Sequence, residues 1–263
     1  MGKVYVVTSG KGGVGKTTTT ANLGVGLAKN GNSVVLMDAD IGLRNLDVIL
    51  GLENRIVYNS MDVMEGTCKL KQALIRDKRY DQLFLLPASQ TNDKMDVSEE
   101  MMEKLVSELK EKFDYVLIDC PAGIEQGFKN AIVGADEALI ITTPEISSIR
   151  DADRVIGLLA ASEMEDIKLI INRVKMKLVN EGNMLHMDDI VDILGLDVVG
   201  IVPDDEEIVI STNKGEPVTV KAVSQSGKAY MNIAGRITGQ DIPFLDINEK
   251  RSLASKFRSF FSR

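Results

Sequence analysis

The sequence of 263 residues has few of the side chains that build metal centres and disulfides. Its one histidine, His186, excludes metal sites made of several histidines and is expected at an ordinary surface position. Its two cysteines, Cys68 and Cys120, form no C-x-x-C pair, which favours free thiols in a reducing cytoplasm over a disulfide framework. No apolar run approaches the length of a transmembrane helix, and the first residues show no signal-peptide pattern. These absences favour a cytoplasmic globular protein.

The charge is unevenly spread along the chain. The formal net charge is −8. Residues 249–263 hold five basic residues against one acidic residue, a net charge of +4, which leaves −12 on the rest. An acidic body argues against nonspecific binding to nucleic acid over a broad surface, and the basic tail is expected to meet an anionic partner.

Short apolar runs rich in β-branched residues alternate with helical patterns. Nearly continuous apolar strands indicate a parallel sheet that is buried on both faces. Alternation of strand and helix predicts a doubly wound α/β fold with a mostly parallel sheet and helices on both faces. Ligands of such sheets bind at the carboxyl ends of the strands. The predicted strands are 3–9, 33–38, 82–88, 114–120, 137–143, 168–173 and 197–203.

The chain shows no linker, repeat or low-complexity segment before about residue 240. Pro243 follows Gly239 and marks a break. We therefore expect one domain over residues 1–240, a connector over 241–248 and a separate amphipathic helix over 249–263.

A phosphate-binding loop follows the first predicted strand. Residues 10–17 fit G-x-x-x-x-G-K-[ST] and open a predicted helix, which is the context that this motif requires. Backbone N–H groups surround the phosphates, Lys16 reaches the β and γ phosphates, and the Thr17 hydroxyl coordinates Mg²⁺. The motif predicts binding of ATP or ADP with Mg²⁺ through Gly10, Lys11, Gly12, Gly13, Val14, Gly15, Lys16, Thr17 and Thr18.

Three carboxylates complete the predicted phosphate chemistry. Asp38 and Asp40 follow the second predicted strand at i and i+2, so both can face the phosphates. One of them would position the attacking water, and the other would hold Mg²⁺ through a water. Asp119 ends a buried apolar strand, the Walker B pattern, and is a second expected magnesium residue. The alternative for Asp38 and Asp40 is a pair of acids that caps a helix.

Lys11 is a second lysine at the mouth of the loop, where its side chain is expected to point outward from its own subunit. A cation that arrives only as charge develops in the transition state contributes most to catalysis. The stretch K-G-G-V-G-K-T-T (11–18) resembles the deviant Walker A signature of the ParA/MinD ATPases. That resemblance implies an ATP-dependent homodimer in which Lys11 crosses to the partner's nucleotide. The alternative is a solvated lysine.

The same resemblance implies roles for further residues. It assigns orientation of the attacking water to Asp40. It assigns adenine recognition to Asn172 in the pair Asn172–Arg173, and contact with the base to the loop at Pro203 and Asp204. Without the resemblance, an asparagine at a strand end or a Pro-Asp pair usually indicates only a turn. The residues implied to lie near the dimer or partner face are Arg44, Asn45, Ser148, Arg150, Asp151 and Asp153.

Several stretches resemble the members of this family that place the cell-division site: DADIGLRNLD (38–47), LPASQT (86–91), DCPAGIE (119–125) and SSIRDADRVIG (147–157). The resemblance implies membrane binding with ATP and recruitment of a MinC-type division inhibitor. It also implies stimulation of hydrolysis by a MinE-type or another topological regulator. We therefore expect a location on the inner face of the cell membrane.

The tail has the pattern of a helix that lies in a membrane surface. Burial of its four large apolar side chains yields on the order of 6–12 kcal/mol, whereas ordering 15 residues costs on the order of 15 kcal/mol. Two tails on one dimer gain about 10²–10⁴ through avidity, so attachment is expected to follow dimerisation. The alternative is a C-terminal helix that is docked on the body. The expected membrane residues are Leu253, Phe257, Phe260 and Phe261, with Lys250, Arg251, Lys256 and Arg258.

Other functions remain open at this point. A DNA-partitioning ATPase of the ParA type has the same ATPase site. It needs a basic dimer surface to bind DNA, which the acidic body does not offer. A redox protein of the nitrogenase iron-protein type needs two cysteines per subunit for an iron–sulfur cluster, and Cys68 and Cys120 do not stand in the matching contexts. A small-molecule kinase or ligase does not explain Lys11.

Overall fold

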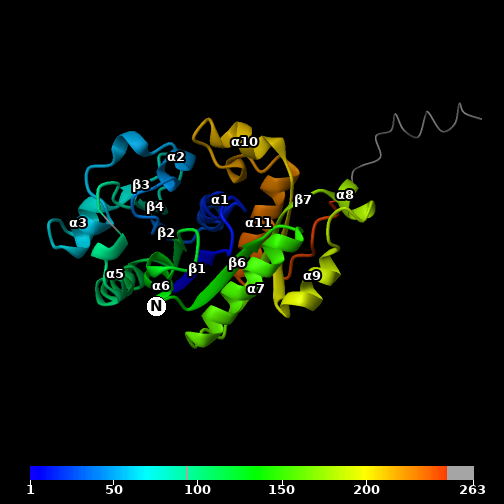
Figure 1. The fold of residues 1–263 in the computed structure, drawn as a ribbon. Coiled ribbons are helices and arrows are strands. Elements are labelled where there is room, and N and C mark those ends of the chain that lie inside the picture. Colours follow the sequence, from blue (N-terminus) through cyan, green and yellow to red (C-terminus); the bar gives the residue numbers. More distant parts are fainter. Residues whose placement is uncertain (93, 248–263) are drawn as a thin grey trace, which may run out of the picture.

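The chain folds around one twisted β-sheet with helices on both faces, as seen in a computed structural model that describes residues 1–92 and 94–247 (Figure 1). The strand order in the described chain is β3-β4-β2-β5-β1-β6-β7-β8. Neighbouring strands are parallel except for the antiparallel pair β3–β4 at one edge. The strands are β1 (Lys3–Thr8), β2 (Val34–Asp38), β3 (Ile75–Arg76), β4 (Leu83–Leu86), β5 (Tyr115–Asp119), β6 (Glu137–Thr142), β7 (Ile167–Val174) and β8 (Asp197–Pro203).

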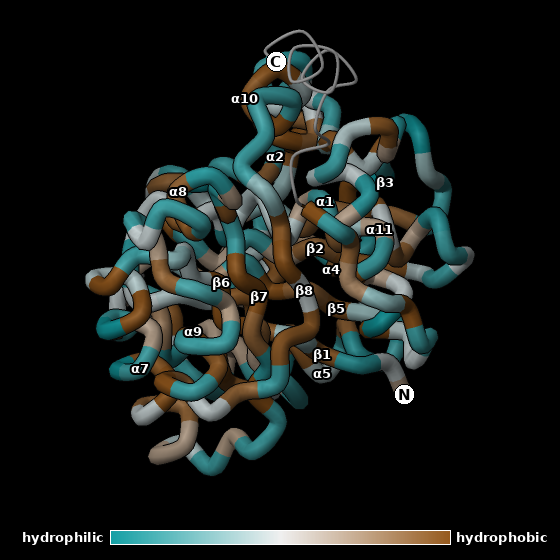
Figure 2. Tube along the Cα trace, turned by 90° about the vertical axis from the view of Figure 1, so that its right-hand side faces the viewer, coloured by the Kyte–Doolittle hydropathy of each residue, from teal (hydrophilic) through white to brown (hydrophobic). Residues whose placement is uncertain are grey.

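Alternating side chains of the strands feed two separate cores. In β1, Val4 and Val6 belong to one buried cluster and Tyr5 and Val7 to the other, as the period of two requires. The first cluster is covered by α5 (Glu99–Lys112), α6 (Gln126–Ile132), α7 (Ile146–Ala161) and α9 (Met187–Leu194). The second is covered by α1 (Lys16–Lys29), α2 (Leu46–Leu50) and α11 (Gln225–Ile237). The apolar strands β6, β7 and β8 stand out in Figure 2.

The remaining elements are short and lie around the edges of these layers. None of the helices in the described residues is long and apolar enough to cross a membrane. The short helices are α3 (Ser60–Met64), α4 (Leu70–Ala73), α8 (Met176–Asn180) and α10 (Glu206–Thr212), with 3₁₀ turns at Glu53–Arg55, Lys94–Asp96 and Val218–Val220.

The predicted fold class is confirmed, and each of the seven predicted strands corresponds to a strand of the sheet with ends that differ by at most two residues. The edge strand β3 was not predicted. It has only two residues, Ile75 and Arg76, which is too short for an alternating pattern to stand out.

Residues 241–247, which follow α11, have no regular secondary structure. Arg236 holds this segment in place by donating hydrogen bonds to the carbonyl oxygens of Ile242 (2.8 Å) and Pro243 (2.8 Å). The guanidinium also lies 4.2 Å from the centre of the Phe244 ring. The connector is therefore docked on the body up to residue 247. Residue 248 and the predicted tail helix, 249–263, lie outside the described residues.

Arg79, whose side chain is 15% exposed, connects three segments of the chain beside α2. Arg79 donates to the carboxylate of Asp77 (2.8 Å), to the carbonyl oxygen of Leu50 (2.8 Å) and to that of Gly215 (2.9 Å). The Asp77 side chain is fully buried. The pair thus joins the end of α2 to the loop that follows α10.

Replacement of Arg79 by alanine is expected to lower the free energy of unfolding by about 3–5 kcal/mol, because it leaves the buried Asp77 charge without its partner. The matched control is Arg76→Ala, since its partner Asp81 is 87% exposed and exposed pairs contribute about 0–1 kcal/mol. Urea denaturation of both variants gives the comparison. Equal losses would contradict the assignment of Arg79 as the structural anchor.

Candidate functional site

The phosphate-binding loop connects β1 to α1 and is clamped from two sides. Gly13 and Gly15 have φ angles of 79° and 101°, which only glycine adopts easily. A Cβ at Gly15 would lie 2.4 Å from Nδ2 of Asn172, and a Cβ at Gly10 would lie 2.1 Å from the carbonyl oxygen of Asp151. Positions 10 and 15 must therefore be glycine, because the loop packs closely against the end of β7 and the first turns of α7.

The two lysines of the loop point in different directions. Lys16 is 8% exposed, and its ammonium donates to Oγ of Ser9 (3.1 Å) inside the loop. The Lys11 side chain is 43% exposed and reaches the N-terminus of α7. There its Nζ lies 3.2 Å from Oγ of Ser147 and 3.6 Å from a carboxylate oxygen of Glu145. Lys11 is thus partly exposed at the rim of the loop and contacts Glu145 of its own subunit. Its crossing to a partner's nucleotide stays a prediction.

Asp38 and Asp119 face each other across neighbouring strands at the carboxyl edge of the sheet. They are register partners of β2 and β5 and are 1% and 2% exposed. Burial raises the pKa of both carboxyls. The Asp38 charge raises the pKa of Asp119 further, and the Asp40 charge does the same for the pKa of Asp38. Hydrogen bonds from Thr17 and Thr20 lower the pKa of Asp119 in part. Two buried acids beside a threonine hydroxyl form a donor set of hard oxygens that suits Mg²⁺.

Asp38 also holds the segment that follows β2. One oxygen accepts from the backbone N–H of Asp40 (2.9 Å), and the other accepts from those of Asn45 (3.1 Å) and Leu46 (3.2 Å) at the start of α2. The capping alternative is thus realised for Asp38. Its backbone contact fixes Asp40 beside the loop, where the role of Asp40 in orienting water stays a prediction.

The predicted base-contact residues lie at the ends of β7 and β8. The Asn172 amide is buried and donates to the carbonyl oxygen of Val14 (2.8 Å), so here it holds the phosphate loop. Arg173 is exposed with a φ of 56°. Pro203 and Asp204 line a cavity of about 740 Å³ beside α8. Recognition of adenine by these four residues stays a prediction.

The residues predicted at the dimer or partner face divide into two groups. Arg150 and Asp153 are exposed on α7, Asn45 is exposed before α2, and Asp151 is half-buried. Arg44 is 16% exposed and paired with Asp47 at 2.8 Å. Ser148 is 2% exposed, so it anchors α7 and offers no surface to a partner. Its hydroxyl is occupied by Thr142 (3.0 Å) and the N–H of Thr143 (3.2 Å).

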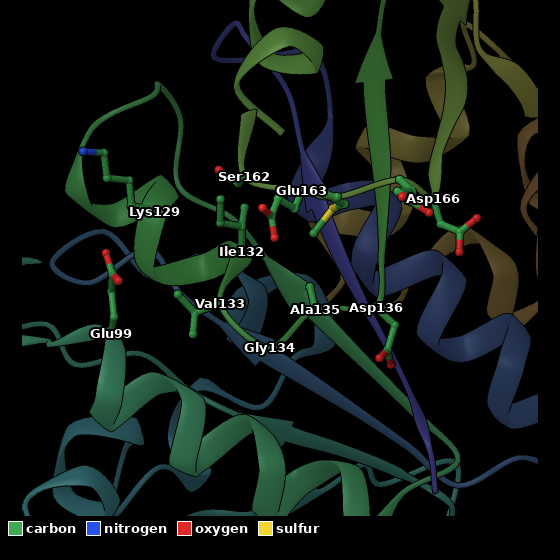
Figure 3. A pocket seen from close by; sticks show the side chains of 12 residues that line it. Glu99, Lys129, Ile132, Val133, Gly134, Ala135, Asp136, Ser162, Glu163 and Asp166 are labelled. Atoms are coloured by element: carbon green, nitrogen blue, oxygen red, sulfur yellow. The ribbon is translucent and has the colours of Figure 1, made fainter. Parts of the chain in front are cut away.

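A second cavity, of about 600 Å³, lies far from the phosphate loop (Figure 3). It opens where β6 and β7 begin, and five carboxyl groups line it against the single amine of Lys129. It contains no element of the phosphate-binding motif. The acids are Glu99, Asp136, Glu163, Glu165 and Asp166.

Comparison with known proteins matches this geometry to one family. A family described as an AAA domain (AAA_31) matches residues 2–178. The chain is 53% identical over 264 residues to the septum site-determining protein MinD of Bacillus subtilis (strain 168), covering 99% of this chain and 98% of that protein. It is 57% identical over 247 residues to MinD of Synechocystis sp. (strain ATCC 27184 / PCC 6803 / Kazusa), covering 94% and 93%. The chain belongs to the MinD family of septum site-determining proteins.

Solved MinD structures agree with this assignment. The MinC:MinD cell division protein complex of Aquifex aeolicus contains a chain that is 51% identical, with a TM-score of 0.86 and coverage of 92% of this chain and 97% of that chain. MinD of Pyrococcus horikoshii OT3, complexed with Mg-ADP, is 29% identical with a TM-score of 0.81 and coverage of 90% and 96%. Membership of the ATP-binding P-loop ATPases, expected from the loop, is confirmed.

The predicted membrane residues of the tail, 250–261, lie outside the described residues. Sequence reasoning also missed three contacts of the site: Ser9 with Lys16, Asn172 with Val14, and Lys11 with the start of α7. Each joins residues through the tertiary fold or a local turn, and no sequence spacing signals it.

Replacement of Asp119 by asparagine is expected to stabilise the protein when Mg²⁺ and nucleotide are absent. The folded state keeps the Asp119 proton to a higher pH than the unfolded chain, whose pKa is about 3.9, so this group's contribution to stability falls as the pH rises. At pH 8 the melting temperature should rise by on the order of 2–8 °C. The gain should shrink toward pH 5.

Thermal denaturation of wild type and variant, with and without Mg-ATP, checks this. The stabilisation by Mg-ATP should be largely lost in Asp119→Asn. Asp81→Asn is the control because Asp81 is 87% exposed. A lower melting temperature of the metal-free Asp119→Asn variant would show that the buried charge is favourable and would refute the argument.

Proposed function

We propose that this chain is an ATP-driven switch that places the cell-division site. It binds ATP with Mg²⁺, dimerises, attaches to the inner face of the cell membrane through its tail and recruits a division inhibitor. Hydrolysis then releases it. The observation that carries this proposal is the pair of lysines on one loop, with Lys16 buried inside it and Lys11 at its exposed rim.

The described residues supply the parts of a phosphoryl-transfer site. Lys16 and the N–H groups at the start of α1 hold the phosphates, and the exposed Gly12 and Gly13 leave the loop open to them. The hydroxyl of Thr17 and the carboxylate of Asp119 would hold Mg²⁺, which neutralises phosphate charge when bound. Binding of Mg²⁺ would favour the ionised forms of Asp38 and Asp119, whose pKa values are raised by burial. Asp40 orients the attacking water.

Exposed apolar side chains beside the loop support a second copy as the dimer partner. Leu43, in the segment after β2, is 68% exposed, and Ile146, at the start of α7, is 67% exposed. Ile146 lies between Glu145 and Ser147, which hold Lys11, and the segment of Leu43 is held by Asp38. An isologous dimer would cover these side chains and bring Lys11 of each subunit to the partner's nucleotide. The in-cis contact of Lys11 with Glu145 must break for this.

The dimer would recruit partners through α7. Arg150 and Asp153 are exposed on this helix and offer both signs of charge. A solved MinD relative is described in complex with MinC, which supports a MinC-type inhibitor as a partner of this chain. A MinE-type or other topological regulator would stimulate hydrolysis at the same dimer.

Replacement of Lys11 by alanine is expected to keep nucleotide binding and to abolish ATP-dependent dimerisation, because Lys16 alone serves the phosphates in cis. Partner-stimulated hydrolysis should fall by about 10³-fold or more, as for a finger residue supplied in trans. Light scattering with ATP and nucleotide titration separate the two effects. Lys112→Ala, on the outer surface of α5, is the control. Dimerisation of Lys11→Ala at the wild-type ATP concentration would refute the trans role.

Vesicle co-sedimentation tests the membrane step. The protein should pellet with anionic liposomes in ATP and remain in solution in ADP. Phe257→Glu should reduce pelleting by about 10-fold or more, because it buries a charge in place of a large apolar side chain. Val57→Glu is the control, since Val57 is 79% exposed on the body.

The same samples with duplex DNA test the ParA-type alternative, for which ATP-dependent retention of DNA is expected instead. Retention of DNA without pelleting on vesicles would replace the membrane role. No specific nucleic-acid partner is expected for a body with a net charge of −12.

A further inference from the structure

A cavity lies at the point where the described chain ends. It has a volume of about 740 Å³ and is formed by the end of β7 with α8, the end of β8, the first residues of α11 and Ile247. Figure 1 shows the last described segment running up beside α8. The last described residue, Ile247, therefore lies at the wall of this cavity.

The walls of the cavity are mainly apolar, with balanced charge. Its apolar lining includes Val174, Met176, Leu178 and Ile247. Among the described residues Leu178 belongs to neither buried cluster, so its half-buried side chain is available to a further apolar partner.

Three of the four charged groups at this cavity have partners in the described structure. Lys175 pairs with Asp204 at 3.4 Å. Asp205 accepts from the hydroxyl of Ser226 at 2.7 Å. Two lysines and two aspartates line the cavity in total, so its net charge is zero. An occupant is therefore bound through apolar contact and not through charge.

We propose that the chain's own tail occupies this cavity while the protein is off the membrane. The tail holds four large apolar residues at the spacing of one helical face, which matches the apolar walls. The acidic cavity in Figure 3 matches the tail's charge better, but it lies where β6 and β7 begin, whereas the tail starts at the ends of β7 and β8. Proximity and apolar lining together favour the cavity beside α8. This inference rests on the proposed membrane role of the tail.

Even weak docking suffices, because the tail is tethered at the cavity. A short tether gives an effective concentration of the order of mM. A docking interaction of mM strength thus occupies the cavity for a large part of the time. If the tail is free for about one tenth of the time, its apparent affinity for a membrane falls about 10-fold. Two tails on a dimer overcome this readily.

The cavity also shares two residues with the predicted base site. Pro203 and Asp204 lie on its wall and on the loop that is expected to contact adenine. A nucleotide that shifts this loop changes the cavity as well. ATP would then favour membrane attachment in two ways, through dimerisation and through release of the tail.

A single tryptophan at residue 257 reports on docking, because the sequence contains no tryptophan. In Phe257→Trp without nucleotide or vesicles, we expect blue-shifted emission that is protected from iodide. Leu178→Glu in this background should shift the emission to that of a water-exposed indole. The same change should raise ATP-independent binding to anionic vesicles about 3- to 10-fold. Ile210→Glu, in a cavity beside α10, is the matched control and should change neither.

Phe260→Glu in the reporter background gives a second test that leaves the body unaltered, and it should expose the indole as Leu178→Glu does. Raised salt should leave the emission unchanged, because the cavity is neutral. Water-exposed emission in the unaltered reporter would overturn the proposal. So would exposure of the indole by Glu163→Gln with Glu165→Gln but not by Leu178→Glu. In both cases ATP-dependent pelleting would still support the proposed function, whereas docked emission without any pelleting would refute the membrane role instead.

Discussion

The close approach of Asn172 and Asp151 to two glycines of the phosphate loop is the constraint on which the site depends. The space at Gly15 and Gly10 is too small for any side chain, so β7 and α7 press the loop into one shape. The amide of Asn172 adds a hydrogen bond to Val14. The loop's N–H groups are thereby oriented before nucleotide binds, which saves the entropy of ordering them later. Because α7 carries both the contact with Gly10 and the partners of Lys11, a change in the loop is transmitted to that helix.

At the same edge of the sheet, the carboxylates of Asp38 and Asp119 repel each other when both are ionised. Parallel strands end together, so β2 and β5 bring two acids into register in a dry environment. Alone, this arrangement opposes folding when both are ionised. A divalent cation reverses the sign of the interaction, since its charge favours the carboxylates that the protein disfavours. Asp38 holds the start of α2 with the same carboxylate. Nucleotide and cation binding can therefore alter the position of the segment that carries Leu43 and Asp40.

The sequence predicts the architecture well because the fold depends on local patterns. Strands buried on both faces appear as apolar runs, and the phosphate loop has a spacing that few other structures require. Contacts between distant segments are a different matter. The burial of Ser148 follows from its bonds to Thr142 and Thr143, although the charged pattern around it is typical of an exposed helix face. The contact of Lys11 with Glu145, 134 positions away, depends on where the start of α7 meets the phosphate loop. The residues of strand β3 carry no pattern at all, because two residues cannot show a period.

The uneven charge of the chain affects how body and tail would interact with an anionic membrane. A body with a net charge of −12 is repelled by an anionic membrane, and within a Debye length of about 8 Å that repulsion opposes the attraction of a tail with +4. Charge alone therefore cannot attach a monomer, and apolar burial must decide. Apolar burial is also what the neutral cavity beside α8 offers to the tail. If the tail docks as proposed, body and membrane would compete for the same side chains, and the number of tails acting together would decide the outcome. In the proposed switch, a dimer would double the membrane contact and leave each cavity with its own tail. The balance would then move toward the membrane only after ATP had joined two subunits.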